Sequence, residues 1–369
     1  MPSTEPSDGQ VYALHLLRGI AAILVMLLHL HGYLTDEPNF VPSGHLAVDL
    51  FFLLSGFVIA YSYDEKLKSG MAPKQFAAVR LIRLFPLYAL SLAIAVLTVA
   101  LTVAEKGWGV YSRLDLLTTF LFSSVFLPTP PPLSTFPDIL YPWNGPAWSL
   151  FFELLINFAY GFVAVKLSGR VLAATIIVAA LLLVAAAFSF GTLEGGATWQ
   201  TYPVGFPRVI FSFSLGVAIK RYWMGPTQLA RIGPWLLSIL CIAILVFDPG
   251  DFLRPYDNLL VIIVLWPLVV IAASRMSFAK GWRIVSQLSG DASYGIYVLH
   301  IPLLNLFVLI TEWDSGAKWG GHGLRFAILS IGAVLMISCW LSYVYDRPIR
   351  HRLMQIFPRG IGIARAPTA

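Results

Sequence analysis

Charged side chains are scarce in this chain. Asp, Glu, Lys and Arg together make up 12% of its 369 residues, whereas hydrophobic residues make up 58%. Soluble globular domains carry roughly 25% charged residues, and the mean hydropathy here is +0.76. A soluble domain is therefore excluded, and the composition predicts an integral membrane protein.

Cysteine is also scarce, and we expect no cleavable leader. Cys241 and Cys339 are the two cysteines, and both fall within apolar runs, which excludes a disulfide framework. The first ten residues hold no Lys or Arg, unlike the basic start of a signal peptide. No repeat or Pro/Gly/Ser-rich linker divides the chain. We therefore expect one integral membrane domain, residues 1–345, followed by a short basic cytoplasmic tail, residues 346–369.

Long apolar runs are what this chain has in abundance. A membrane-spanning helix needs about 20 apolar residues, and ten runs approach that length. The predicted fold is an all-α, polytopic membrane helical bundle of about ten transmembrane helices. The run at 114–127 is too short for a span and predicts a re-entrant or interfacial helix. The ten runs lie near residues 12–33, 45–63, 84–104, 146–165, 171–190, 203–222, 233–248, 256–274, 292–311 and 324–345.

Lys and Arg predict the orientation of these spans. With the N-terminus inside, 18 of the 25 basic residues fall in inner segments and five in outer ones. Such a bias follows the positive-inside rule and places both termini in the cytoplasm. The inner loops also account for the net charge of +6, so no nucleic-acid partner is expected.

Two ionisable residues interrupt the first apolar run. Arg18 and His29 are eleven residues apart, which places them on one helix face about 16 Å apart along its axis. Ionisable groups at membrane depth are costly, so they usually face a polar interior and serve a function. We therefore interpret this face as part of a functional site.

Counting residues along the spans groups the other polar side chains into two layers. Asp49 and Glu153 fall at the depth of His29, toward the outer face, and Arg208 joins them. A histidine beside a carboxylate is typical of general acid–base chemistry. This pattern predicts an outer catalytic layer in which Glu153 or Asp49 orients His29.

The inner layer is cationic. Arg80 and Arg83 stand one turn apart at the inner end of the third span, and Arg18 lies near the same depth. One guanidinium group can bind two phosphate oxygens at once, so the cluster predicts a site for an anionic ligand. The competing interpretation is that Arg80 and Arg83 are ordinary positive-inside anchors.

Six sequence strings resemble the membrane acyltransferase-3 family of bacterial O-acyltransferases. They are LRGIAAILVMLLH at 17–29, VDLFFLLSGFVIA at 48–60, RLIRLFPLY at 80–88, PAWSLFFE at 146–153, SYGIYVLH at 293–300 and YDRP at 345–348. The resemblance implies transfer of an acyl group, commonly acetyl from acetyl-CoA, to a hydroxyl of a surface polysaccharide, a lipid-linked glycan or a secreted small molecule. It also implies a multi-pass protein of the bacterial inner membrane.

The resemblance assigns roles to residues in these strings. It implies that His29 is catalytic, and the motif residues Trp148, Ser149 and Glu153 belong to the site. We expect Glu153 and Asp49 to assist His29, either in direct transfer or through an acetylated His29. We expect Arg80, Arg83 and Arg18 to bind acyl-CoA, and no metal is expected. Trp148, Ser149, Tyr297 and His300 are the predicted substrate-binding residues.

Other interpretations remain open. His300 is also explained as a hydrogen-bonded structural group, and Asp49 as the partner of an arginine. Ten spans with buried ionisable residues are also compatible with a proton-coupled transporter of a small solute. Besides acyl-CoA, the expected partners are a glycan or lipid-linked glycan acceptor and the lipid bilayer, and a homodimer is possible.

Overall fold

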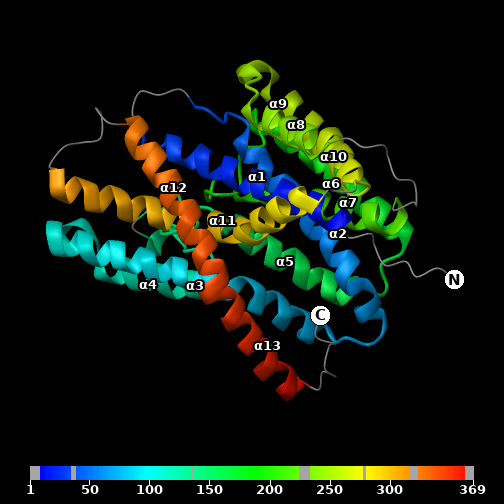
Figure 1. The fold of residues 1–369 in the computed structure, drawn as a ribbon, viewed down its shortest axis with the longest axis horizontal. Coiled ribbons are helices and arrows are strands. Elements are labelled where there is room, and N and C mark those ends of the chain that lie inside the picture. The colour runs from blue at the N-terminus through cyan, green and yellow to red at the C-terminus, as the bar shows by residue number, and fades with distance from the viewer. Residues whose placement is uncertain are drawn as a thin grey trace.

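The computed structural model describes residues 9–34, 39–134, 136–223, 233–276, 280–315 and 323–361, and nearly all of these residues are helical (Figure 1). An isolated bridge between Ile139 and Thr198 is the only β-pairing among them. The α-helices are α1 (Gly9–His31), α2 (Ala47–Lys68), α3 (Pro73–Lys106), α4 (Arg113–Ser124), α5 (Ala147–Val163), α6 (Gly169–Phe190), α7 (Tyr202–Tyr222), α8 (Pro234–Val246), α9 (Gly250–Leu260), α10 (Trp266–Ala273), α11 (Lys280–Ser315), α12 (Gly323–Leu341) and α13 (Arg347–Ile361).

The predicted fold class is confirmed. Within the residues that the structure describes, eight helical segments are long and apolar enough to cross a membrane, and α5 and α8 are shorter apolar helices. Together they overlap the ten predicted runs. The 12-residue α4 is too short to span, as expected for the run at 114–127. The number of spans and the side on which the termini lie stay predictions.

Three helices are longer than their apolar runs. Helix α3 begins at Pro73 instead of residue 84, and α11 begins at Lys280 instead of residue 292. A π-helical turn, Ser342–Asp346, joins α12 to α13, so the predicted tail is helical as far as Ile361. The rest of the tail, 362–369, lies outside the described residues. Hydropathy detects only the part of a helix that lies in lipid, whereas helical hydrogen bonding continues beyond it.

Two helix pairs form the centre of the bundle. Helix α1 lies along α11, and α2 lies along α7 (Figure 1). In the second pair a Cβ at Gly56 would collide with the carbonyl of Phe213, and one at Gly216 with the carbonyl of Leu53. Small residues that allow backbones to approach this closely are common where membrane helices pack.

An ion pair fastens α2 to α7 near each end of this contact. Asp49 pairs with Arg208 at one end, and Asp64 pairs with Arg221 at the other, with nitrogen–oxygen distances of 2.6 and 2.7 Å. Tyr160 of α5 donates a hydrogen bond to Asp64 and so joins the second pair. These contacts hold α2, which forms one wall of the site described below.

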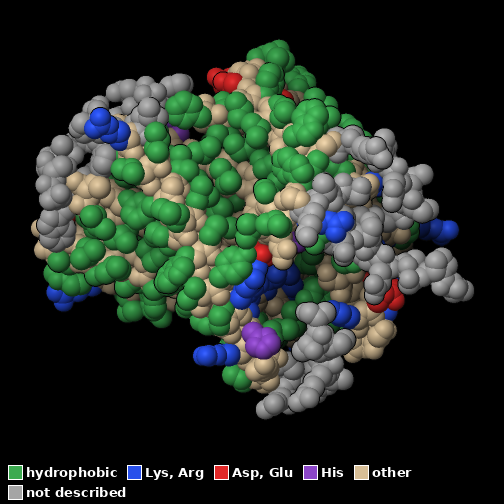
Figure 2. All heavy atoms as spheres, in the orientation of Figure 1, with side chains coloured by type: hydrophobic (Ala, Val, Ile, Leu, Met, Phe, Trp, Pro, Cys, Tyr) green, Lys and Arg blue, Asp and Glu red, His purple; other side chains and the backbone are tan. Residues whose placement is uncertain are grey.

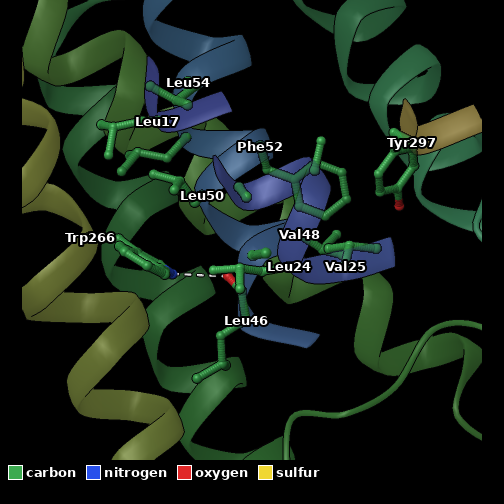
Figure 3. Packing of buried hydrophobic residues seen from close by; sticks show 14 of the residues in the cluster. Leu17, Leu24, Val25, Leu46, Val48, Leu50, Phe52, Leu54, Trp266 and Tyr297 are labelled. Carbon is green, nitrogen blue, oxygen red and sulfur yellow. Dashed lines mark hydrogen bonds between the residues drawn. The ribbon is translucent and has the colours of Figure 1, made fainter. Parts of the chain in front are cut away.

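Apolar side chains fill the interior and also cover the outside. In Figure 3 the indole Nε1 of Trp266 donates to the carbonyl of Leu46, just before α2, at 2.9 Å. Figure 2 shows hydrophobic side chains over most of one face of the molecule, and Phe162, Leu181 and Leu329 are among the exposed ones. An apolar exterior is what contact with lipid requires.

Candidate functional site

A cavity of about 330 Å³ lies between α1, α2, α3, α5 and α11. Its volume is within the range of small-molecule sites, and its walls mix aromatic, aliphatic and polar side chains. The polar and ionisable side chains lining it are those of His15, Arg18, Ser55, Tyr61, Ser62, Tyr63, Arg80, Arg83, Ser149, Glu153, Ser293, Tyr294 and Tyr297.

Arg80 and Glu153 form the ion pair of this cavity. Arg80 Nη2 donates to Glu153 Oε1 at 3.0 Å, and the Ser55 hydroxyl donates to the same oxygen at 2.9 Å. Arg80 is buried, and its Nε has no hydrogen-bond partner in the described part of the chain. One donor of this guanidinium therefore remains available to a ligand.

Arg18 and Arg83 line the same cavity without an ion-pair partner among the described residues. Arg18 is close enough to Arg80, Arg83 and Glu153 to interact with them electrostatically. The cavity thus holds three guanidinium groups against the single carboxylate of Glu153. Such an uncompensated cluster in a low-dielectric interior favours an anionic ligand.

More ionisable groups surround the cluster where α12 passes into α13. Arg347 pairs with Asp291, and Arg350 pairs with Asp346 at 2.8 Å. Asp291 is in turn close enough to His15 and Arg18 to affect both electrostatically. Figure 2 shows Lys and Arg side chains gathered in this region of the surface.

Ser149 and Tyr297 form the polar wall of the cavity between α5 and α11. Their hydroxyl oxygens are 2.6 Å apart, and both also lie within hydrogen-bond distance of the carbonyl oxygen of Pro146. Since each hydroxyl has one hydrogen, one hydroxyl donates to the other and the second donates to Pro146. The ring of Phe51 packs edge-on against Tyr297, with ring centroids 5.3 Å apart. The sequence placed Ser149 and Tyr297 in the site, and the structure brings them together.

A pair of histidines lies beyond Tyr297. The rings of Tyr297 and His300 have centroids 6.2 Å apart, and the rings of His300 and His29 are 5.0 Å apart. His29 Nδ1 is 2.8 Å from the carbonyl oxygen of Val25 and 3.3 Å from His300 Nε2. The side chains that line the arginine cavity in the described residues include neither histidine. Tyr297 thus lies between the cavity and the histidine pair.

The predicted partnership of His29 with a carboxylate is wrong. Glu153 bonds to Arg80 and Ser55, and Asp49 bonds to Arg208, whereas His29 meets His300. From the sequence, Arg80 is expected at the inner end of the third span, in a different layer from Glu153. Because α3 begins at Pro73, Arg80 lies about 10 Å inside the helix, deep enough to reach Glu153.

Trp148 and His300 do not line the cavity in the part of the chain that the structure describes. The Trp148 ring lies 5.4 Å from the guanidinium carbon of Arg208, in a cation–π contact beside the Asp49 pair. His300 is fully buried. The predicted role of both residues in substrate binding stays a prediction.

His15 is a cavity residue that was not predicted from the sequence. It lines the cavity one helical turn before Arg18, and its Nδ1 is buried without a hydrogen-bond partner among the described residues. The spacing of three residues from Arg18 places both side chains on the same face of α1 and was the signal available in the sequence. No group of three or more His, Cys, Asp or Glu that could hold a metal ion occurs in the described residues.

Known proteins are similar to this chain over most of its length. A family model described as "Acyltransferase domain" matches residues 11–347. Nodulation protein 10 of Rhizobium leguminosarum bv. viciae is 25% identical over 98% of this chain and 100% of its own length. The exopolysaccharide production protein ExoZ of Rhizobium meliloti (strain 1021) is 24% identical over 84% of this chain and 90% of its own. The putative peptidoglycan O-acetyltransferase YrhL of Bacillus subtilis (strain 168) is 26% identical over 95% of this chain, which covers 56% of YrhL. No solved structure matches the chain significantly.

Proposed function

Because the chain belongs to the acyltransferase-3 family, we propose that it transfers an acetyl group from cytoplasmic acetyl-CoA to a hydroxyl of an extracytoplasmic glycan. The observation that carries the proposal is the presence of Arg18 and Arg83 in one cavity without a counter-ion in the described residues. These residues supply the anion site that an acyl-CoA donor needs, and the nearby His29 supplies a base.

The cavity residues suit the donor's chemistry. Arg18 and Arg83, with the free Nε of Arg80, would bind phosphate oxygens of the donor through charge-assisted hydrogen bonds. Glu153 holds Arg80 in place and limits the excess positive charge. The apolar stretch lined by Val48, Phe51 and Phe52 suits the uncharged arm that carries the thioester.

His29 would act as the general base. It takes the proton of the acceptor hydroxyl on Nε2 while the hydroxyl oxygen bonds to the acetyl carbon and the carbon–sulfur bond breaks. The proton then passes from His29 to the departing thiolate, so the products are an ester and a free thiol. Ser149 and Tyr297 lie between the cavity and His29, where a hydroxyl donor could stabilise the developing oxyanion.

The acceptor class and the location rest on the relatives and on the charge bias. ExoZ and YrhL are named for exopolysaccharide production and for peptidoglycan O-acetylation, which favours a glycan acceptor here. The bacterial relatives favour the bacterial inner membrane. The excess of Lys and Arg in alternate loops favours an orientation in which the arginine cavity lies toward the cytoplasm. Inverted membrane vesicles, which expose the cytoplasmic face, should consume added acetyl-CoA, whereas sealed right-side-out vesicles should not.

The donor site is tested by binding. Arg18→Gln and Arg83→Gln should each weaken binding of radiolabelled acetyl-CoA to the purified protein in lipid nanodiscs by about 10- to 100-fold, the usual range for loss of a charge-assisted hydrogen bond. Added salt should weaken wild-type binding as well.

The matched control is Arg254→Gln. On α9, Arg254 is paired with Asp251 of the same helix and with Asp248 just before it, outside the cavity lining, so its loss should leave acetyl-CoA binding unchanged. Wild-type affinity in both Arg18→Gln and Arg83→Gln would contradict the proposed donor site. Binding without any acetyl transfer to a crude cell-envelope glycan extract would contradict the reaction.

The hydroxyl pair of Ser149 and Tyr297 gives a separate prediction. Tyr297→Phe keeps the ring that packs on Phe51 but removes the hydroxyl, so it should lower kcat by about 10-fold or more while acetyl-CoA binding stays near the wild-type value. Steady-state kinetics with a direct binding measurement would separate the two effects. An unchanged kcat would exclude the Tyr297 hydroxyl from the reaction.

A further inference from the structure

His29 and His300 are in contact, and the proposed reaction gives His300 no role. The two side chains come from α1 and α11, which run in parallel: Gly19 meets Ser289, His29 meets His300, and Tyr33 bonds to Asn305. The imidazole rings are tilted by 46° with centroids 5.0 Å apart. Contacts before and after the histidines therefore fix their relative position along both helices.

Backbone carbonyls determine which ring nitrogens carry hydrogen. His29 Nδ1 lies 2.8 Å from the carbonyl oxygen of Val25, and His300 Nδ1 lies 2.9 Å from that of Ile296. A carbonyl oxygen can only accept, so both Nδ1 atoms must donate. In the neutral rings both Nε2 atoms are then unprotonated acceptors. His300 Nε2 faces the Nδ1–H of His29 at 3.3 Å, and this hydrogen is shared between two acceptors.

We propose that His300 is a positioning residue for His29: its Nε2 holds the Nδ1–H of His29, keeps His29 Nε2 free to accept the substrate proton, and stabilises the imidazolium that forms. This inference rests on the proposed function. His300 takes the place that the sequence assigned to Glu153 or Asp49, and it does so as a neutral group. A ring that itself carries no charge thus stabilises the positive charge that forms on His29.

A purely structural role does not account for this arrangement. His300 is fully buried, and the bond to Ile296 already satisfies its Nδ1. Its Nε2 has no partner other than His29 among the described residues. An apolar side chain would fill the same space without the cost of burying a second polar nitrogen. The imidazole of His300 therefore contributes an Nε2 acceptor that faces His29, which an apolar side chain would lack.

The test compares His300→Leu with His300→Gln in the full-length protein in nanodiscs. Leucine removes the acceptor and should lower kcat by about 10- to 100-fold, the effect of losing a hydrogen bond to a charged group. The KM values and acetyl-CoA binding should stay near wild type, because His300 does not line the donor cavity in the described residues. Glutamine retains an acceptor oxygen and should recover much of the lost kcat.

His45→Leu is the matched control for the loss of a buried imidazole. His45 is also buried, but its ring bonds to Asn258, away from His29, so its loss should not produce a selective fall in kcat. The inference is overturned if His300→Leu turns over at the wild-type rate, if His300→Gln is as impaired as His300→Leu, or if KM and stability account for the loss. A wild-type protein that transfers no acetyl group would instead overturn the proposed function.

Discussion

Replacing His29 with alanine is expected to lower acetyl transfer by about 10²- to 10⁴-fold, the range that a general base contributes. The reason is geometric: His29 Nδ1 is engaged by Val25 and His300, which leaves Nε2 to take the proton of the acceptor. Acetyl-CoA binding should survive, because His29 does not line the arginine cavity in the described residues. Radiolabel transfer to a glycan extract measures the first effect, and filter binding the second.

His31→Ala is the control for this experiment. His31 lies on the same helix two residues further on, at the end of α1, and no ring contact or hydrogen bond ties it to the histidine pair in the described residues. Its loss should change transfer only slightly. A His29→Ala protein that folds, binds acetyl-CoA and transfers acetyl within about tenfold of wild type would remove His29 from the reaction.

Hydropathy predicted the fold because lipid imposes it. Every backbone polar group in the hydrocarbon must be bonded within the protein, so an apolar run of sufficient length is almost certain to be a helix. The same logic fails at helix ends. Nothing in the hydropathy of residues 73–83 distinguishes a loop from the first turns of α3, and hydropathy falls after residue 346 although the helix continues to Ile361.

The site was predictable as a set of residues but not as a set of partners. Arg18, Arg80 and Arg83 were identified from their positions in apolar surroundings, and the structure brings them to one cavity. Counting residues along a span gives depth to within about one turn, and it gives no rotation of one helix against another. Glu153 therefore looked like a partner of His29, whereas the packing of α5 against α3 directs it to Arg80.

Asp49 also has a partner that depth along the span did not predict, because it pairs with Arg208 instead of His29. Its replacement is expected to have a large effect on stability. Asp49→Ala is expected to destabilise the protein by about 3–5 kcal/mol, the cost of leaving a buried charge without its partner. Arg208 donates to both carboxylate oxygens of Asp49 and to the carbonyls of Gly195 and His45, and both side chains of the pair are 1% exposed or less. Denaturation in detergent micelles, followed by intrinsic fluorescence, would measure the loss.

A double substitution separates this structural role from the catalytic one predicted by sequence. Asp49→Leu with Arg208→Leu removes both charges, so the double variant should be more stable than either single variant, because a buried ion pair can often be replaced by apolar residues at little cost. A catalytic Asp49 predicts the opposite pattern, in which Asp49→Ala folds with wild-type stability but loses turnover. Since the hydrogen bonds of Asp49 go to Arg208 and those of His29 go to Val25 and His300, we expect the loss of Asp49 to act on folding. Transfer should then fall only in proportion to the protein that folds.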